Sequence, residues 1–265
     1  MVQSVAIFGN SHVSAIKTAW EEAKQDYPQV SFTFFAARAN YMKYIEARDG
    51  VLVPTNEVTE RSIGFTSGGK SKIDPKEYDC FLVYALGARP YLPDASVFYS
   101  DQVHQVTIAN RRARQLAWRT VKQIKSVTDR PIIVGENPLP SLLSEQALRD
   151  SGDFEEGRVD YTYGVELAER LFYKEHNIRL QRQPLQTIDN GRWTKEEFCK
   201  GSERLAIGHR SDGSAHDETD TNHMNTAYGH IWLKAFMPLL QGLRDRGGSE
   251  NLDKGAKWRF GLRSA

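Results

Sequence analysis

This sequence of 265 residues has few cysteines, no long apolar run and no large excess of either charge. The two cysteines, Cys80 and Cys199, are too few to build a disulfide framework in a chain of this length. Cys80 lies within an apolar run, which favours a buried thiol that packs as a small hydrophobic side chain. We therefore expect neither a disulfide-stabilised fold nor a thiol-based enzyme.

The chain also lacks the signals of membrane insertion and export. No segment approaches the roughly 20 consecutive apolar residues that a transmembrane helix needs. Residues 1–10 carry no basic region and too short an apolar stretch for a signal peptide. The sequence thus predicts a cytoplasmic protein without a membrane partner.

Charge is nearly balanced, with 35 basic and 34 acidic side chains and a net charge of +1. No overall field therefore favours binding to nucleic acid or to an acidic surface. Basic residues do crowd one predicted helix, namely Arg111, Arg112, Arg114, Arg119, Lys122 and Lys125. Because no aromatic platform is interleaved with them, they are typical of a solvated helix face, and we expect no nucleic-acid partner.

Short apolar runs alternate with stretches of helical periodicity along the chain. The runs predict strands at residues 2–8, 30–36, 80–86, 131–134 and 178–180. Apolar side chains at helical spacing predict helices at residues 13–23, 113–124, 165–172 and 227–239, and Pro238 should kink or end the last one. This order indicates crossover connections, and hence an α/β fold: a three-layer α/β/α sandwich with a mostly parallel, flavodoxin-like sheet.

Two segments interrupt this alternation, and a third follows it. Residues 38–72 form an irregular insertion, in which residues 51–53 and 59–66 are candidates for an accessory hairpin. Residues 201–219 are polar and rich in Gly and Ser, which is typical of a loop. We therefore predict one domain at residues 1–243 with these two insertions, followed by a charged, Gly-rich tail at residues 244–265.

Ligands of open parallel sheets bind beyond the carboxyl ends of the strands, so the residues after each strand are candidates for a site. The first predicted strand is followed by Gly9-Asn10-Ser11-His12. Gly9 permits a tight turn, and the helix that begins there directs free N–H groups toward an oxyanion beside Ser11. Ser11 is thus either a nucleophile or a helix N-cap, a position that serine favours.

A serine nucleophile requires a general base, and the segment Asp220-Thr221-Asn222-His223 supplies a candidate. A carboxylate three residues before an imidazole can hold one ring nitrogen, which leaves the other nitrogen for Ser11. The alternative is that Asp220 is an N-cap and His223 a surface residue of the first helical turn.

Together these two motifs resemble the SGNH (GDSL-type) hydrolases. The resemblance rests on Gly9-Asn10-Ser11-His12 after the first strand and on Asp220-x-x-His223 before the last helix, and it spans about residues 2–240. It implies the SGNH hydrolase fold and a serine mechanism on esters or acyl groups. In that mechanism Ser11 is the nucleophile, His223 its base and Asp220 the orienting partner, and the Ser11 N–H is one oxyanion donor.

The end of the third predicted strand departs from the family's pattern Gly-x-Asn-Asp, because Gly87-Ala88-Arg89-Pro90 stands there. Arg89 takes the position of the Asn that donates to the oxyanion in the family. An arginine either donates in a different geometry or simply pairs with a surface acid.

The remaining oxyanion donors are also open. The family's glycine after the second strand is missing, so the backbone N–H of Ala37 or Arg38 is a candidate in its place. Asn137, after the next predicted strand, either supplies an amide or is a turn residue before Pro138. The strand-end arginines Arg38 and Arg89 would together suit a substrate with a carboxylate or phosphate.

Histidines crowd both ends of the predicted site. His12 follows the nucleophile and either lines the site or faces solvent. Side chains of the types that bind zinc gather in one segment, namely His209, His216, Asp217, Asp220 and His223. No two of these histidines have helical i, i+4 spacing with a glutamate between, so we expect no metal and no cofactor.

The sequence therefore predicts a serine-dependent hydrolase of a small acyl or carbohydrate ester, working through a Ser-His-Asp triad. One alternative is an O-acyltransferase that delivers the acyl group to a sugar hydroxyl. Another is a non-catalytic binding module on the same scaffold. The missing Asn after the third strand favours this alternative. The loops that shape a pocket carry specificity without a readable code, so the ester itself is not predicted.

Overall fold

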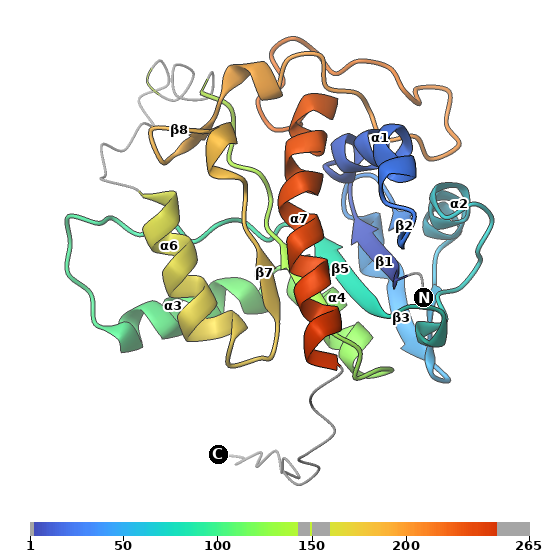
Figure 1. Ribbon diagram of the computed structural model, residues 1–265, viewed down its shortest axis with the longest axis horizontal. Coiled ribbons are helices and arrows are strands. Elements are labelled where there is room, and N and C mark those ends of the chain that lie inside the picture. Colours follow the sequence, from blue (N-terminus) through green and yellow to red (C-terminus); the bar gives the residue numbers. More distant parts are fainter. Residues whose placement is uncertain (1–2, 143–148, 150–159, 248–265) are drawn as a thin grey trace, which may run out of the picture.

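Five parallel strands form the central sheet of the computed structural model, which describes residues 3–142, 149 and 160–247 (Figure 1). The strands are β1 (Gln3–Gly9), β2 (Val30–Ala36), β5 (Cys80–Tyr84), β6 (Ile132–Gly135) and β7 (Arg179–Gln181). Their order is β2-β1-β5-β6-β7, and each neighbouring pair is parallel. In this flavodoxin-like order the chain winds from β1 to one edge and then to the other.

Side chains of β1 alternate between two hydrophobic cores, one on each face of the sheet. Val5 and Ile7 belong to the core beneath α1 (Val13–Ala23) and α7 (Thr226–Gly247). Ala6 and Phe8 belong to the other core, which is covered by α3 (Asp101–Ala113), α4 (Leu116–Lys125) and α6 (Tyr161–Ala168). Two helical layers thus enclose one sheet, which confirms the predicted three-layer α/β/α fold.

A glycine sets the distance between α1 and α7, which lie beside each other in Figure 1. A Cβ at Gly229 of α7 would lie 2.1 Å from the Ala15 carbonyl oxygen and 2.8 Å from the Ala19 Cβ of α1. No side chain fits at that spacing, so only glycine permits the contact. Because Ser11 precedes α1 and His223 precedes α7, this packing brings the two predicted site residues to the same end of the molecule.

The insertion at residues 38–72 differs from the prediction in its elements. The accessory hairpin pairs β3 (Ile45–Arg48) with β4 (Val51–Pro54), and α2 (Glu57–Thr66) replaces its predicted second strand. The side chain of Asn56 caps α2 at its start. The buried face of α2 consists of Thr59, Ser62, Ile63 and Thr66. Three of these four side chains are small and polar, so apolar periodicity could not mark the helix.

Three other helices have bounds that differ from the prediction. The helix predicted at residues 165–172 is the second half of α6 followed by a π-helical turn at residues 169–173. The helix predicted at residues 113–124 is the end of α3 and nearly all of α4, which are separate helices. The last helix passes through Pro238 and reaches Gly247, so the predicted tail from residue 244 starts inside it. Residues 248–265 lie outside the described residues.

The remaining elements are short. They are the 3-10 helices η1 (Lys24–Asp26), η2 (Tyr41–Tyr44), η3 (Pro75–Glu77), η5 (Leu185–Thr187) and η6 (Glu196–Phe198), the π-helical turn η4 (Glu169–Tyr173), and the strands β8 (Ile188–Asp189) and β9 (Trp193–Thr194). Residues 201–219 form a loop, as predicted. Within the described ranges, none of the helices combines the length and the hydropathy that crossing a membrane requires.

Candidate active site

A sharp turn between β1 and α1 presents Ser11. A Cβ at Gly9 would lie 2.8 Å from the Cβ of Val13, so glycine is needed for α1 to begin so soon after β1. The Asn10 carbonyl accepts the N–H of Val13, and the Asn10 side-chain oxygen accepts the N–H of His12. Gly9 and Asn10 thus build the turn. The Ser11 hydroxyl does not cap the helix, which begins without a side-chain cap.

The partner of the Ser11 hydroxyl is His223, which lies 212 residues further along the chain. Ser11 Oγ is 2.8 Å from His223 Nε2, and His223 Nδ1 is 2.8 Å from Asp220 Oδ2. When Nδ1 carries the ring proton, Ser11 donates to Nε2 and His223 donates to Asp220. The structure therefore brings the three side chains named from the sequence into one hydrogen-bonded chain.

Asp220 is held as a carboxylate by its own segment. The N–H groups of Asn222 and His223 donate to Asp220 Oδ1 at 2.8 and 2.9 Å. Partial burial by itself raises the pKa of Asp220, but these two N–H groups and the His223 ring outweigh it and lower the pKa to about 2. The ionised carboxylate keeps the proton on His223 Nδ1 and so leaves Nε2 free to accept from Ser11.

Asp220 is not the N-cap of the last helix. The helix α7 begins at Thr226, and Asn225 accepts the N–H of Tyr228 at its start. The amide of Asn225 also donates to the carbonyls of Glu197 and Lys200. The Asp220–His223 segment is therefore anchored just before α7 rather than within its first turn.

His12 packs on His223 instead of facing solvent. The two ring centroids are 4.9 Å apart with planes 22° from parallel. Burial lowers the pKa of His12, and the neighbouring His223 lowers it further, to about 3. His12 is therefore neutral at any pH at which a histidine base can work.

The neutral His12 makes the stability of the fold depend on pH. Its pKa is about 3 in the folded protein and 6.5 as an ordinary histidine. As the pH falls from 6.5 to 3, the unfolded chain binds a proton that the folded protein refuses, so the free energy of unfolding decreases. We expect His12→Gln to reduce this slope by at most about 1.4 kcal/mol per pH unit. Urea denaturation of both proteins across that window measures it, and identical slopes would contradict a buried, neutral His12.

The turn after β5 has an unusual backbone. Ala85, Leu86 and Gly87 follow one another with φ values of 60°, 52° and 76°, and two of them are not glycine. Such residues persist in left-handed conformations only where their surroundings hold them. Here the Asn137 N–H donates to the Ala88 carbonyl at 2.8 Å, and Arg112 Nη1 donates to the Arg89 carbonyl at 2.6 Å. Asn137 and Arg112 thus hold the turn that carries Arg89.

The side chain of Arg89 is exposed at this strand end. Among the described side chains, no carboxylate forms an ion pair with it, so the surface pairing considered from the sequence is not found there. Its role as an oxyanion donor stays a prediction.

Arg38 corrects an expectation from the sequence. Its guanidinium donates to the Leu205 carbonyl at 2.6 and 3.0 Å and to Ser211 Oγ at 2.7 Å, and it pairs with Asp212 at 2.9 Å. These partners already neutralise Arg38, so it is not held ready beside Arg89 for a substrate anion. Instead it ties the end of β2 to the loop at residues 201–219.

The backbone supplies the oxyanion donors that the structure supports. Among the described residues, no protein acceptor takes the N–H of Ser11. The Ala37 N–H donates to the Gly9 carbonyl at 3.3 Å, which removes it from the candidates named from the sequence. The side-chain oxygen of Asn137 is buried and has no partner in the described part of the chain, but an oxygen only accepts, so the role of the Asn137 amide as a donor stays a prediction. The N–H of Ser11 and the N–H of Arg38 are therefore the backbone donors that stay available, because neither has an acceptor among the described residues.

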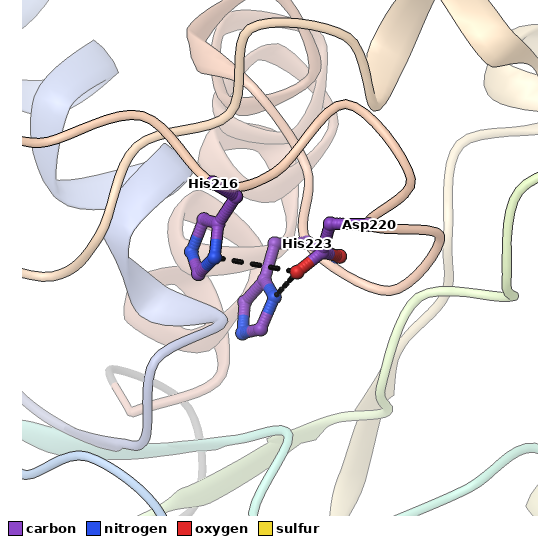
Figure 2. Close-up of side chains that lie close together, drawn as sticks. All are labelled: His216, Asp220 and His223. Atoms are coloured by element: carbon purple, nitrogen blue, oxygen red, sulfur yellow. Dashed lines mark hydrogen bonds and ion pairs between the residues drawn. The ribbon is translucent and has the colours of Figure 1, made fainter.

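A metal is the competing explanation for the histidine cluster. The ligand atoms of His216, Asp220 and His223 all lie within 4.8 Å of one another (Figure 2). However, the rings of His216 and His223 are stacked 4.0 Å apart with planes only 8° from parallel. The Nδ1 atoms of both rings contact the same oxygen, Asp220 Oδ2, at 3.3 and 2.8 Å, which are hydrogen-bond distances, whereas zinc sits about 2.0–2.1 Å from each imidazole nitrogen. This geometry fits a hydrogen-bonded site better than a metal site.

The prediction for Arg112, which supports the turn that carries Arg89, was wrong. Arg112, predicted to lie on a solvated helix face, is buried and forms an ion pair with the buried Glu136. Tyr173 also donates to Glu136 at 3.3 Å. Helical spacing could have indicated this burial from the sequence, because Arg112 lies four residues after the buried Ile108 and so shares the inner face of α3.

Neither cysteine takes part in the site. Both are free and buried. Burial raises the pKa of the Cys80 thiol to about 12 and that of Cys199 to about 11. Both are therefore protonated at neutral pH, as inert structural thiols are.

No known protein family matches the chain, and no curated protein is similar to it in sequence. Among solved structures, one similar chain is the periplasmic domain of a lipopolysaccharide acetyltransferase from Salmonella ser. Paratyphi A. It shares 9% identity at a TM-score of 0.44, over 91% of this chain and 84% of that chain. So slight a likeness carries no argument about activity, and function has to be argued from the site itself.

Proposed function

We propose that this protein is a serine-dependent hydrolase of small acyl or carbohydrate esters, with Ser11 as its nucleophile. The observation that carries the proposal is the chain of two 2.8 Å hydrogen bonds from Ser11 through His223 to Asp220. A nucleophile, its base and an orienting carboxylate at these spacings are the requirement for serine catalysis. Ser11 also lies beyond the carboxyl end of β1, where ligands of such sheets bind, in keeping with the resemblance to SGNH hydrolases.

In the first step, Ser11 Oγ attacks the carbonyl carbon of the ester while His223 Nε2 takes the hydroxyl proton. The carbonyl oxygen becomes an oxyanion, which accepts a hydrogen bond from the N–H of Ser11. The bond to the leaving oxygen then breaks, and His223 returns the proton to the departing alcohol. Asp220 stabilises the transient imidazolium and keeps the ring oriented throughout.

In the second step, water attacks the acyl group on Ser11 while His223 takes a proton from the water. The acyl–oxygen bond to Ser11 breaks, the proton passes to Ser11 Oγ, and the acid leaves. An O-acyltransferase shares the first step and differs only in using a sugar hydroxyl in place of this water. Arg89, exposed at the neighbouring strand end, supports a substrate that carries an anionic group.

The proposal is tested by chemical labelling of the purified protein with a fluorophosphonate at neutral pH. We expect one adduct per chain, located by mass spectrometry on the peptide that contains Ser11. Hydrolysis of a short p-nitrophenyl ester, followed with and without added sugars, then separates hydrolase from transferase. A folded protein that forms no adduct and turns over no ester would overturn the proposal in favour of a binding module.

A further inference from the structure

The ring of His223 lies between two other imidazoles. His12 stacks on it at a centroid distance of 4.9 Å, and His216 stacks on it at 4.0 Å. His12 and His216 contact His223 but, among the described rings, not each other, which places them on opposite faces of it. His12 comes from the turn before α1, whereas His216 comes from the loop at residues 201–219. Two separate segments of the chain thus meet at His223, the general base of the proposed triad.

His216 also reaches the carboxylate that orients His223. Its Nδ1 lies 3.3 Å from Asp220 Oδ2, the oxygen that His223 Nδ1 contacts at 2.8 Å (Figure 2). The side chain of His216 is only 8% exposed, and its Nε2 is buried without a partner in the described part of the chain. Burying an unpartnered ring nitrogen costs free energy, so this placement calls for a compensating role.

We propose that His216 is a positioning residue that holds His223 and Asp220 for catalysis, a role that rests on the proposed function of Ser11. Its flat ring covers one face of His223, as His12 covers the other, and so limits His223 to rotations within its own plane. The cover also excludes water from the imidazolium that forms when Ser11 gives up its proton. The two outer rings meet that cation with aromatic faces, which attract it as long as both rings are neutral.

The charges around His216 agree with a neutral outer ring. Burial lowers the pKa of His216, and His223 lowers it further. Asp220 acts in the opposite direction, while Arg204 and Arg38 add to the lowering. His12, on the far side of His223, is neutral as well. A proton on His216 would place a second positive charge 4.0 Å from His223 and compete for Asp220, so we expect acid to switch the site off.

Two substitutions separate the stacking role of His216 from its contact with Asp220. His216→Phe keeps a flat ring against His223, whereas His216→Ala removes both the ring and the contact. We expect His216→Ala to lose about tenfold in kcat with little change in KM, because the base is less well placed. In His216→Ala the acid limb of the pH–kcat profile should also move to higher pH by about half a unit, since water then reaches the face of the His223 imidazolium. His216→Phe should stay within about threefold of the parent in kcat.

A second readout does not depend on turnover. The proton shared by His223 Nδ1 and Asp220 gives a far-downfield proton NMR signal when it is sheltered from water. We expect this signal in the parent and in His216→Phe, and its loss by exchange with water in His216→Ala. His209→Asn is the matched control, because His209 is an exposed histidine of the same loop and an asparagine can keep the contact of the His209 Nδ1 with Ser211, so the kinetics and the signal should stay unchanged.

The outcomes distinguish this inference from the proposed function. If His216→Ala is folded and matches the parent in kcat, acid limb and downfield signal, His216 positions nothing and the inference is overturned. If kcat falls but neither the acid limb nor the signal moves, the effect is only structural, and the inference is again overturned. If the parent hydrolyses no ester, the proposed function fails, and the NMR signal alone then decides whether His216 shelters the His223–Asp220 pair.

Discussion

Ser11→Ala is expected to lower kcat for a short p-nitrophenyl ester by a factor of about 10⁴ or more. Without the hydroxyl, His223 Nε2 has no nucleophile to deprotonate, and only water and the oxyanion donor remain. The melting temperature should change little, because Asn10 rather than the Ser11 side chain stabilises the turn before α1. Steady-state kinetics and fluorophosphonate labelling, each beside a thermal melt, measure these expectations.

Ser31→Ala is the control for this substitution, because Ser31 is an exposed serine on β2. It should keep full activity and full labelling at Ser11. Undiminished turnover by Ser11→Ala would show that another group attacks the ester. If the parent and Ser11→Ala bind a substrate with the same affinity and neither of them turns it over, the binding-module alternative is favoured instead.

Asp220→Asn is expected to reduce kcat by about 10⁴-fold with a smaller effect on KM. The new side-chain oxygen can still accept the N–H groups of Asn222 and His223, which leaves the amide NH₂ facing His223 Nδ1. An NH₂ donates a hydrogen bond, so His223 would have to carry its proton on Nε2. In that tautomer the ring cannot accept the proton of Ser11.

Asp217→Asn is the matched control, since Asp217 is an exposed acid three residues before Asp220. It should stay within about twofold of the parent, because surface substitutions of this kind rarely disturb a fold. A parent-like rate for Asp220→Asn would remove the carboxylate from the mechanism. The double variant Ser11→Ala with Asp220→Asn should be no slower than Ser11→Ala alone, because residues that act as one unit are not additive.

The fold followed from local patterns that survive in tertiary structure. Buried parallel strands are apolar on both faces, so most of β1 and all of β5 appear as continuous apolar runs in the sequence, whereas in the edge strand β2 Ser31 and Thr33 interrupt the apolar residues. The predictions from the sequence were wrong where polar or charged side chains are buried. Small polar side chains bury one face of α2, and Arg112 is buried because Glu136 neutralises it.

The site divides in the same way. Asp220 and His223 are three residues apart, so a short turn is enough to join them, and the sequence predicted their contact from spacing. Arg38, in contrast, was expected to face a substrate, but Asp212 neutralises it from the loop at residues 201–219. Nothing in the spacing of residues 38 and 212 could indicate that ion pair.

By itself, the sequence determined the α/β/α architecture, the turn that presents Ser11 and the Asp220–His223 pair, because strand periodicity, turn glycines and short-range spacing are local properties. Only the tertiary structure decided that Ser11 Oγ lies 2.8 Å from His223 Nε2 and that His12 and His216 enclose the His223 ring. These contacts depend on how closely α7 packs on α1 at Gly229 and on where Arg38 anchors the preceding loop. Contacts of that kind arise from packing between distant segments, which no local pattern of residues specifies.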